Sequence, residues 1–511
     1  MRIDIVISML TRRSALQTLA GMAAAPAILR ARRTPGDKPN LLFLWTDQQR
    51  ADSMAAYGNT RYHVPVWNKL AAECVVFDRC YDAQPVCTPA RSCVMTGTWP
   101  HQNGCTHNNI KLRADVKTMP ELLDDSSYRT GYMGKWHLGD EVFAQRGFQE
   151  WRAIEDGIYQ DYYSEDRDKN ARSAYHHFLL EMGYKPDDNS HPNSFSRNFA
   201  TKMPVEHSKP SFLAQEASNF ILKNRNEPWM LYVNTLEPHT PFSSALNDLH
   251  TPEEAPLQKN YPGLPASPEP EAYKKRRQGF LDKPEGKWDL HTPQGWQRMH
   301  RNYAGLCSLV DQAWGRILWA LEVSGQLENT ILVHTSDHGE MMGSHTLMAK
   351  SVMYQEAVHV PLLLRVPFRN QKPHHIAQPV SHIDIIPTLL DLMGKKDVSG
   401  FAGEPLTNVL LGRRKPDDIF IEWNQDPDAG GGPRCRTVVT PDGWKLAVHD
   451  TDVSLLFDRN KDPLEMDNLY YQPEHAATVK RLRAKIEAFQ KKTRDDMVMP
   501  EISSTPPSPS A

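Results

Sequence analysis

The sequence predicts an α/β fold with a large mixed, mostly parallel sheet sandwiched by helices, followed by a smaller C-terminal antiparallel sheet with a helix. Apolar runs that are typical of strands buried on both faces occupy residues 40–46, 229–236, 330–335 and 361–366. Apolar residues at spacings of three and four between 303 and 321 indicate a helix with one core-facing side. Near residue 370 the pattern changes to short strand-like runs.

The length and charge of the chain limit the classes of protein to consider. Its 511 residues, 40% of them hydrophobic, suffice for one large α/β domain with a smaller one, or for three ordinary domains. The formal net charge of −3 gives no support for a nucleic-acid or anionic-membrane partner. We therefore expect a globular protein with no nucleic-acid partner and no membrane span.

The N-terminus has the composition of a targeting segment. Arg12 and Arg13 precede a weakly apolar run at residues 15–29, which is too short and too mild to span a bilayer. Paired arginines before such a run are typical of a twin-arginine export signal, and residues 25–27 (Ala-Pro-Ala) fit a small-residue cleavage site. The alternative is a cytoplasmic amphipathic N-terminus. We expect residues 1–38 to be an export signal with a linker, and the protein to be periplasmic or extracellular.

The region after residue 370 predicts the smaller sheet. Runs at 418–423, 435–440 and 444–449 resemble short strands, with a hairpin turn at Pro441-Asp442-Gly443 and a charged helix over about 474–494. The Ser- and Pro-rich end is expected to be disordered. Two further stretches, 150–209 and 243–300, lack clean periodicity, and we expect these insertions to shape a ligand pocket.

Polar residues follow three of the buried runs, where the strands end. They are Asp47-Gln48, Glu237-Pro238-His239 and Ser336-Asp337-His338. Ligands of open α/β sheets bind beyond the carboxyl ends of the strands, so these residues indicate one shared site. A single aspartate in such a position is most often a turn residue. An oxygen-dominated ligand set suits calcium or magnesium, and an imidazole also admits manganese.

The stretch Cys87-Thr88-Pro89-Ala90-Arg91 carries the most specific signal. Residues 85–89 predict a turn and residues 90–97 a helix, which places Cys87 at a helix start, where free backbone N–H groups favour an anion. The commoner state of such a cysteine is a buried free thiol. The chain has seven cysteines and no C-x-x-C, so a thiolate zinc site is not expected, and in an exported protein at least one cysteine stays unpaired.

Six blocks of the chain, in order, resemble the type I sulfatases, which are alkaline-phosphatase-like enzymes. The blocks are residues 41–50, the Cys87 pattern with Thr96-Gly97, Gly134-Lys135-Trp136-His137, Glu237-Pro238-His239, residues 336–340 with Lys350, and residues 456–469. The similarity spans about residues 39–469. It implies a catalytic sulfatase domain over 39–370, a C-terminal α+β subdomain over 371–498 and a tail over 499–511.

The resemblance implies a sulfuric ester hydrolase of the arylsulfatase type, which cleaves a sulfate monoester to an alcohol and sulfate. Its nucleophile would be Cα-formylglycine, made from Cys87 by a formylglycine-generating enzyme, and the reaction would pass through a covalent sulfated formylglycine. Asp47, Gln48, Asp337 and His338 would bind one divalent metal, with residue 87 completing the shell. Calcium is the first choice, and magnesium or manganese are the alternatives. The substrate would be a sulfated small molecule or carbohydrate.

The resemblance also assigns roles to the other polar residues of the blocks. Arg91 would hold the formylglycine hydrate, Lys135 and Lys350 would grip sulfate oxygens, His137 would act as a base, and His239 would contact sulfate or protonate the leaving oxygen. The structural alternatives are a surface ion pair for Arg91, solvated surface positions for the lysines and a loop hydrogen bond for His239. His345 lies near these blocks without an assigned role.

Two positions depart from the commonest sulfatase pattern. Gln48 stands where many members have a second aspartate, and His338 stands where many have an asparagine. Both exchanges also occur in choline-sulfatase-like enzymes and phosphonate monoester hydrolases. A phosphonate monoester or phosphodiester hydrolase on the same scaffold is therefore the alternative enzyme. A non-catalytic protein that binds sulfated glycans is the third hypothesis, and an unconverted Cys87 would distinguish it.

Overall fold

The computed structural model describes residues 38–264, 268–284, 288–369, 372–425 and 432–507. Apart from Lys38, the expected export signal lies outside the described residues. Within them, no helix combines the length and the apolar character that crossing a membrane requires.

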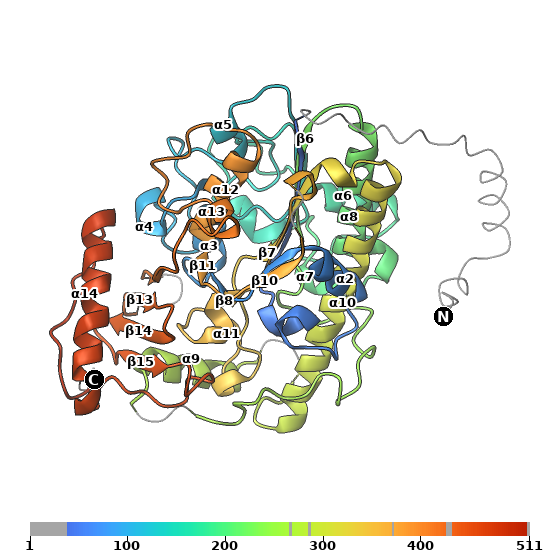
Figure 1. Ribbon diagram of the computed structural model, residues 1–511. Helices are drawn as coiled ribbons and strands as arrows, with labels where there is room; N and C mark the ends of the chain where they lie inside the picture. The colour runs from blue at the N-terminus through green and yellow to red at the C-terminus, as the bar shows by residue number, and fades with distance from the viewer. Residues whose placement is uncertain (1–37, 265–267, 285–287, 370–371, 426–431, 508–511) are drawn as a thin grey trace, which may run out of the picture. The chain divides into compact units, whose positions relative to one another are not determined.

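An eight-stranded sheet forms the centre of the fold, in the order β10-β2-β9-β7-β1-β6-β4-β5 (Figure 1). Its strands are β1 (Asn40–Thr46), β2 (Val75–Phe77), β4 (Arg129–Gly134), β5 (Glu150–Arg152), β6 (Trp229–Asn234), β7 (Thr330–Ser336), β9 (Leu362–Arg365) and β10 (His374–Ile376). Strand β9 is antiparallel to β2 and β7, whereas the other described pairings in this sheet are parallel. The predicted large, mostly parallel sheet is confirmed.

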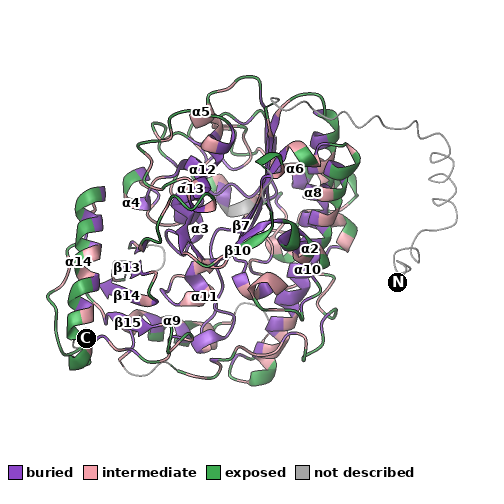
Figure 2. Cartoon of the chain, viewed as in Figure 1, coloured by how far each residue is buried: buried purple, intermediate pink, exposed green. Residues whose placement is uncertain are grey.

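The sheet is buried on both faces because successive side chains of its central strand enter two different cores. Leu42 and Leu44 pack into one core with α8 (Lys209–Lys223) and α10 (Pro293–Val323). The alternate residues Leu41, Phe43 and Trp45 enter the second core, with α3 (Cys87–Thr96) and α12 (Ile385–Leu392). Figure 2 shows the buried strands between these helix layers. This double burial explains the continuous apolar runs of the sequence.

The remaining short elements connect these layers. The helices are α2 (Pro65–Glu73), α4 (Pro100–Asn103), α5 (Met119–Leu123), α6 (Ala174–Glu181), α7 (Arg197–Ala200), α9 (Glu271–Asp282), α11 (Gln355–Val358) and α13 (Leu406–Leu410). A three-stranded sheet is formed by β11 (Val380–Ser381), β3 (Cys80–Tyr81) and β8 (His359–Val360).

Helices α3 and α10 both begin earlier in the chain than the sequence predicts. Helix α3 begins at Cys87 rather than at residue 90, because Pro89 lies in the first turn, where its missing N–H is tolerated. The expectation of two long irregular stretches is wrong where β5, α6 and α7 lie within residues 150–209, and where α9 and the start of α10 lie within residues 243–300. The charged helix α9 has few apolar residues to reveal it, and the carboxylate of Asp452 accepts hydrogen bonds from its first backbone N–H groups at 2.9 and 3.0 Å.

The C-terminal part forms an antiparallel sheet of β12 (Ile419–Trp423), β13 (Cys435–Val439), β14 (Trp444–His449) and β15 (Leu455–Asp458), with α14 (Ala476–Thr493) packed on it. The predicted sheet and closing helix are confirmed, and β15 was not predicted. The boundary at residue 370 stays a prediction, and β10, beyond it, pairs with β2 of the large sheet. Residues 501–507 are exposed without helix or strand, and 508–511 lie outside the described residues.

A buried ion pair joins the end of α14 to the C-terminal sheet. The guanidinium of Arg436 in β13 donates to Asp495, with a 2.7 Å bond from Nη2 to Oδ1, and the two side chains are 2% and 0% exposed. We predict that Asp495→Ala lowers the free energy of unfolding by about 3 kcal/mol, because it leaves a buried charge without its partner. Asp115→Ala, which breaks an exposed pair with Arg113, is the matched control and should leave the stability unchanged. Urea unfolding measures both, and equal effects would contradict this account.

Candidate active site

The polar residues that follow β1 and β7 meet because these strands are paired in register. Trp45 is opposite Thr335 and Thr46 is opposite Ser336, so Asp47 and Asp337 follow at the same edge of the sheet. On the other side of β1, the sheet continues with β6 and β4, whose ends lead to His239 and Lys135. Helix α3 brings Cys87, its first residue, to this edge. Five separate segments of the chain therefore converge on one place.

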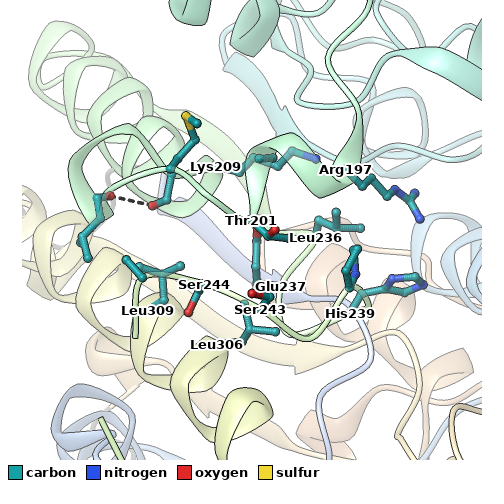
Figure 3. Close-up of a pocket in the computed structure, with 16 residues that line it drawn as sticks. Arg197, Thr201, Lys209, Leu236, Glu237, His239, Ser243, Ser244, Leu306 and Leu309 are labelled. Atoms are coloured by element: carbon teal, nitrogen blue, oxygen red, sulfur yellow. Dashed lines mark hydrogen bonds between the residues drawn. The ribbon is translucent and has the colours of Figure 1, made fainter. Parts of the chain in front are cut away.

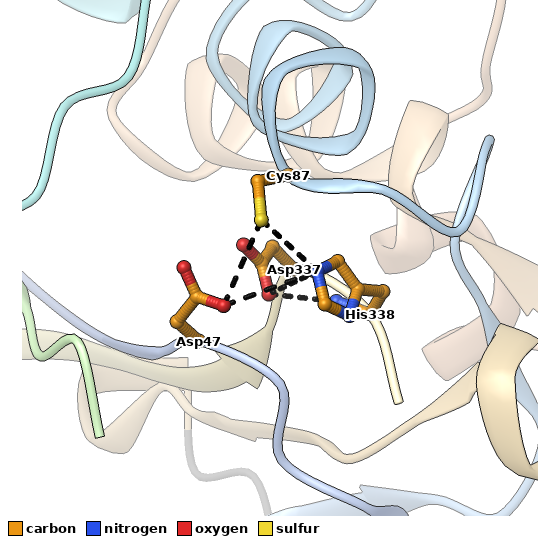
Figure 4. Close-up of side chains that lie close together, drawn as sticks. All are labelled: Asp47, Cys87, Asp337 and His338. Carbon is orange, nitrogen blue, oxygen red and sulfur yellow. Dashed lines mark hydrogen bonds and ion pairs between the residues drawn. The ribbon is translucent and has the colours of Figure 1, made fainter. Parts of the chain in front are cut away.

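Asp47, Cys87, Asp337 and His338 form a compact group of potential metal ligands (Figure 4). One ligand atom from each lies within 4.8 Å of the others, and all four residues are buried. The Cys87 sulfur lies 3.3 Å from Nε2 of His338 and 3.9 Å from Oδ1 of Asp47. Nδ1 of His338 lies 2.9 Å from the carbonyl oxygen of Gly339, which favours a proton on Nδ1 and leaves Nε2 free to accept. Two carboxylates and such an imidazole fit a divalent cation.

Arg91 connects the carboxylates of Asp47 and Asp337. Its Nη2 donates to Oδ2 of Asp47 at 2.7 Å, and its Nε donates to Oδ2 of Asp337 at 3.0 Å. Nη1 donates to the carbonyl oxygen of Lys135 at 2.8 Å, and the guanidinium lies 4.9 Å from the centre of the Trp45 ring. Arg91, Asp47 and Asp337 are all 0% exposed. The surface-ion-pair alternative for Arg91 is thereby excluded.

Lys135 places a second cation beside Asp47 and Cys87. Its Nζ donates to Oδ2 of Asp47 at 2.6 Å and lies 3.7 Å from the Cys87 sulfur. Although burial acts to raise it, Lys135, His239 and Arg91 hold the pKa of Asp47 well below its usual value. Burial and Asp47 also act to raise the pKa of the Cys87 thiol, but Lys135, Lys350 and His338 lower it to about 7. The thiol therefore lies in an electropositive environment of the kind that activates cysteines.

Gly134 is required for the turn that presents Lys135. Its φ is +119°, and a Cβ on this residue would lie 1.7 Å from the carbonyl oxygen of Asn234 in the neighbouring strand β6. The next residue donates its backbone N–H to that same oxygen at 3.2 Å. A side chain at 134 would separate the ends of β4 and β6 and move Lys135. The solvated-surface alternative for Lys135 is excluded, because the side chain is 1% exposed.

His137 lies on the same turn with its ring held as a neutral base. Nε2 lies 2.8 Å from Oδ1 of Asn109, and Nδ1 has no hydrogen-bond partner among the described residues. The carboxylate of Glu141 accepts the backbone N–H groups of Trp136 and His137, both at 2.7 Å. Burial and the nearby Lys135 hold the pKa of His137 well below its ordinary value. A neutral imidazole with one free nitrogen can accept a proton.

Gln48, His239 and Lys350 form a second group of polar side chains that contact one another. Nζ of Lys350 donates to the side-chain oxygen of Gln48 and lies 3.0 Å from Nε2 of His239. The Gln48 amide nitrogen donates to Glu340. The carboxamide of Gln48 is thus engaged by these two neighbours, and its role as a metal ligand stays a prediction. His239 also contacts the carbonyl oxygen of Thr240 through Nδ1 at 2.7 Å.

Several residues of this site were not found from the sequence. Asn109, Glu141 and Glu340 hold His137, its backbone and Gln48, but none of them has a spacing or a motif that indicates these contacts. Glu340 lies within a matched block, which is the only available signal. His345 is fully buried and stacks on the Tyr354 ring, with ring centres 3.9 Å apart. All seven cysteines lie in the described part of the chain, are buried and form no disulfide.

Comparisons with known proteins agree with this arrangement. The family model "Sulfatase" matches residues 39–395, and the model "N-sulphoglucosamine sulphohydrolase, C-terminal" matches residues 343–492. The chain is 30% identical over 473 residues to the Uncharacterized sulfatase YidJ of Escherichia coli (strain K12), covering 90% of this chain and 88% of that protein. It is 27% identical over 525 residues to the N-acetylglucosamine-6-O-sulfatase of Bacteroides thetaiotaomicron, covering 90% and 87%.

Solved structures with the same fold include a protein in complex with a sulfated sugar substrate and a phosphonate monoester hydrolase. The structure of BT4656 in complex with its substrate D-glucosamine-2-N,6-O-disulfate has a TM-score of 0.70 at 25% identity and covers 90% of this chain and 99% of that chain. A phosphonate monoester hydrolase from Silicibacter pomeroyi has a TM-score of 0.75 at 23% identity, covering 89% and 96%, and shows the shared fold alone.

The fold and the site define an alkaline-phosphatase-like hydrolase, with its candidate catalytic groups at the carboxyl ends of a mostly parallel sheet. Within that class, the chain belongs to the sulfatase family. It is a sulfuric ester hydrolase, which cleaves a sulfate monoester to an alcohol and sulfate.

Proposed function

We propose that this sulfatase uses Cα-formylglycine at position 87 and a divalent cation, and that it acts on a sulfated carbohydrate. The observation that carries the proposal is the position of the Cys87 side chain, at the first turn of α3 and within 4 Å of both Asp47 and His338. A formylglycine-generating enzyme would be the maturation partner. Asp47, Asp337 and His338 would hold the cation, and Gln48 would join them once its amide oxygen is released by Lys350.

The chain's own residues provide the charge and the proton transfers that sulfate ester cleavage needs. Once converted, residue 87 would supply a hydrated aldehyde as the nucleophile. The bound cation would offset the charge of a sulfate oxygen. Lys135 and Lys350 present two further cations to the sulfate. His137, neutral and with Nδ1 free, can take a proton from the residue-87 hydroxyl. His239, whose Nε2 lies 3.0 Å from Nζ of Lys350, is placed to contact the sulfate.

Calcium is our first choice for the metal. Carboxylate and carboxamide oxygens are hard ligands, and one imidazole in the set also admits manganese. Magnesium demands a stricter octahedral geometry and prefers to keep several waters. Replacing a carboxylate by Gln48 removes one negative charge from the ligand set, which makes metal selectivity a direct question for experiment.

A sulfated carbohydrate is the proposed substrate class. The relatives include the N-acetylglucosamine-6-O-sulfatase and the Ulvan-active sulfatase of Formosa agariphila, which is 28% identical over 467 residues. A choline-sulfatase of Rhizobium meliloti, 25% identical over 449 residues, represents the small-molecule alternative. The phosphonate monoester or phosphodiester alternative is distinguished by relative rates on phenyl esters with the same leaving group, and we expect the sulfate to be cleaved fastest.

The first prediction tests the nucleophile. Cys87→Ser should fold, because one atom changes, and should lose at least about a thousandfold in turnover of an aryl sulfate when the host's maturation enzyme acts on cysteine alone. Cys93→Ser, in the same helix and equally buried, is the matched control and should keep wild-type turnover. Wild-type rates in Cys87→Ser would contradict the proposed nucleophile.

The second prediction tests the metal site without relying on activity. After chelation, added Ca²⁺ should raise the melting temperature of the folded enzyme, since a ligand at a hundred times its Kd stabilises a protein by about 2.7 kcal/mol. Asp337→Asn should raise the calcium concentration needed for the same rise in melting temperature at least tenfold. Asp52→Asn, which changes a residue paired with Arg50, should leave that concentration unchanged. Melting curves that are identical with and without calcium, magnesium and manganese would exclude the site.

We also propose export through a twin-arginine signal, supported by Arg12, Arg13 and the apolar run after them. Exchange of both arginines for lysine should leave the precursor in the cytoplasm, because that signal depends on the arginine pair. Cell fractionation with N-terminal sequencing measures this, and the exported wild type should begin shortly after residue 27. Unchanged export of the double variant would rule out this route.

A further inference from the structure

Three hollows lie near the proposed sulfate site. The first is lined by His239, Glu237, Arg197 and Lys209 (Figure 3). The second, of about 130 Å³, shares Arg197 and Lys209 with the first and adds Tyr159. A third adjoins His137 and again includes Tyr159. Because the first borders His239 and the third borders His137, the alcohol part of a substrate whose sulfate is bound at Cys87 would extend toward this region.

Arg197 lines the first two hollows, and its position is fixed by its neighbours. Nε donates to Oε2 of Glu155 at 2.8 Å, and Nη2 donates to the Tyr159 hydroxyl at 2.9 Å. The Tyr159 ring packs edge-to-face on His137, with ring centres 4.9 Å apart. In Figure 3, the guanidinium and the His239 ring lie at the same end of the first hollow. Arg197 is therefore one side chain removed from His137 and shares a cavity with His239.

The cluster around Glu155 keeps an excess positive charge. Arg197 and Lys209 both pair with this single carboxylate. Although burial acts to raise it, the two cations lower the pKa of Glu155 to about 2, so this carboxyl group is ionised. Its single negative charge faces the two positive charges of Arg197 and Lys209. The side chains of Glu155 and Lys209 are 3% and 5% exposed, whereas that of Arg197 is 30% exposed. The excess charge is thus presented to the hollow by Arg197.

One guanidinium nitrogen of Arg197 is free to bind an anion. No described residue accepts a hydrogen bond from its Nη1, while Nε and Nη2 are held by Glu155 and Tyr159. The N–H groups of Nη1 can donate charge-assisted hydrogen bonds to a sulfate or carboxylate oxygen. The adjacent Glu237 has a buried Oε2 without a partner among the described residues, which can bond to a sugar hydroxyl. The hollow therefore offers one cationic donor and one polar acceptor.

We infer that Arg197 is a specificity-determining residue, which binds a second anionic group on the alcohol part of the substrate. The preferred substrate is then a sulfate ester whose sugar carries another sulfate or a carboxylate, rather than a sugar whose only anionic group is the ester sulfate. This inference rests on the proposed function, because it assumes that the ester sulfate occupies the site at Cys87. It also gives a role to the insertion at residues 150–209, which supplies Glu155, Tyr159 and Arg197.

Direct binding to calcium-loaded Cys87→Ser enzyme tests the inference, because the ligands are then not consumed. Calorimetry compares three ligands: glucosamine-2-N,6-O-disulfate, a monosulfated disaccharide with a uronic acid carboxylate, and the singly anionic N-acetylglucosamine 6-O-sulfate. At least one of the two doubly anionic ligands should bind about tenfold or more tightly than the singly anionic one. Preference for the disulfate assigns a second sulfate to Arg197, and preference for the uronate assigns a carboxylate.

Arg197→Gln in the same background should remove that preference. The Kd of the preferred ligand should rise about tenfold or more, while the Kd of N-acetylglucosamine 6-O-sulfate should change less than about threefold. Arg152→Gln is the matched control, since Arg152 is also a partly exposed arginine in a glutamate pair, with Glu216, but lines none of these hollows. Arg197→Lys keeps the charge and should retain part of the preference.

Three results would overturn the inference: equal affinities for the three ligands, an equal loss of affinity for all three in Arg197→Gln, or a preference that persists in Arg197→Gln. Failure of the proposed function is a separate result, seen as wild-type enzyme that turns over none of these sulfate esters. The binding measurements do not depend on turnover, so the two failures are distinguishable.

Discussion

The buried guanidinium of Arg91 is the interaction on which the rest of the site depends. It donates to Asp47 and Asp337, which follow neighbouring strands and would repel each other without it. Burying such charges is expensive, and removing one partner of a buried pair is strongly destabilising. Arg91 therefore stabilises a cluster of carboxylates that a divalent cation can use. It also fixes α3, and with it Cys87, against the edge of the sheet.

The parallel sheet converts sequence order into this geometry. Because β7, β1, β6 and β4 are neighbours with the same direction, the segments after them meet although they are far apart in the chain. The cations Lys135 and Lys350 and the neutral imidazole of His137 are held in place by neighbouring side chains and backbone rather than by a ligand. Such prearranged charge is the main source of catalysis in charged-ester hydrolysis. Residues of the two insertions line hollows near this site, where we infer that substrates are distinguished.

The sequence predicted those parts of the structure that have a local signal. Strand β1 has the predicted bounds, because seven apolar or small residues end at Asp47, and the turn at Gly443 has the positive φ that its glycine indicates. Helix α9 had no such signal, because its cap is the carboxylate of Asp452, far along the chain. Asn109, Glu141 and Arg197 were not predicted from the sequence for the same reason. Their roles follow from contacts that form only in the folded chain. The direction of β9 also depends on its neighbours, which a run of apolar residues does not reveal.

The proposed mechanism requires an aldehyde rather than a thiol at residue 87 of the active enzyme. A mass measurement on the peptide that contains residues 85–95, taken from fully active enzyme, shows which group is present. Replacement of the thiol by an aldehyde lowers the mass of this peptide by about 18 Da. We expect that loss, and we expect sequencing of the peptide by fragmentation to locate it at residue 87 and not at Cys93. An intact thiol at Cys87 in enzyme with full turnover would contradict this mechanism.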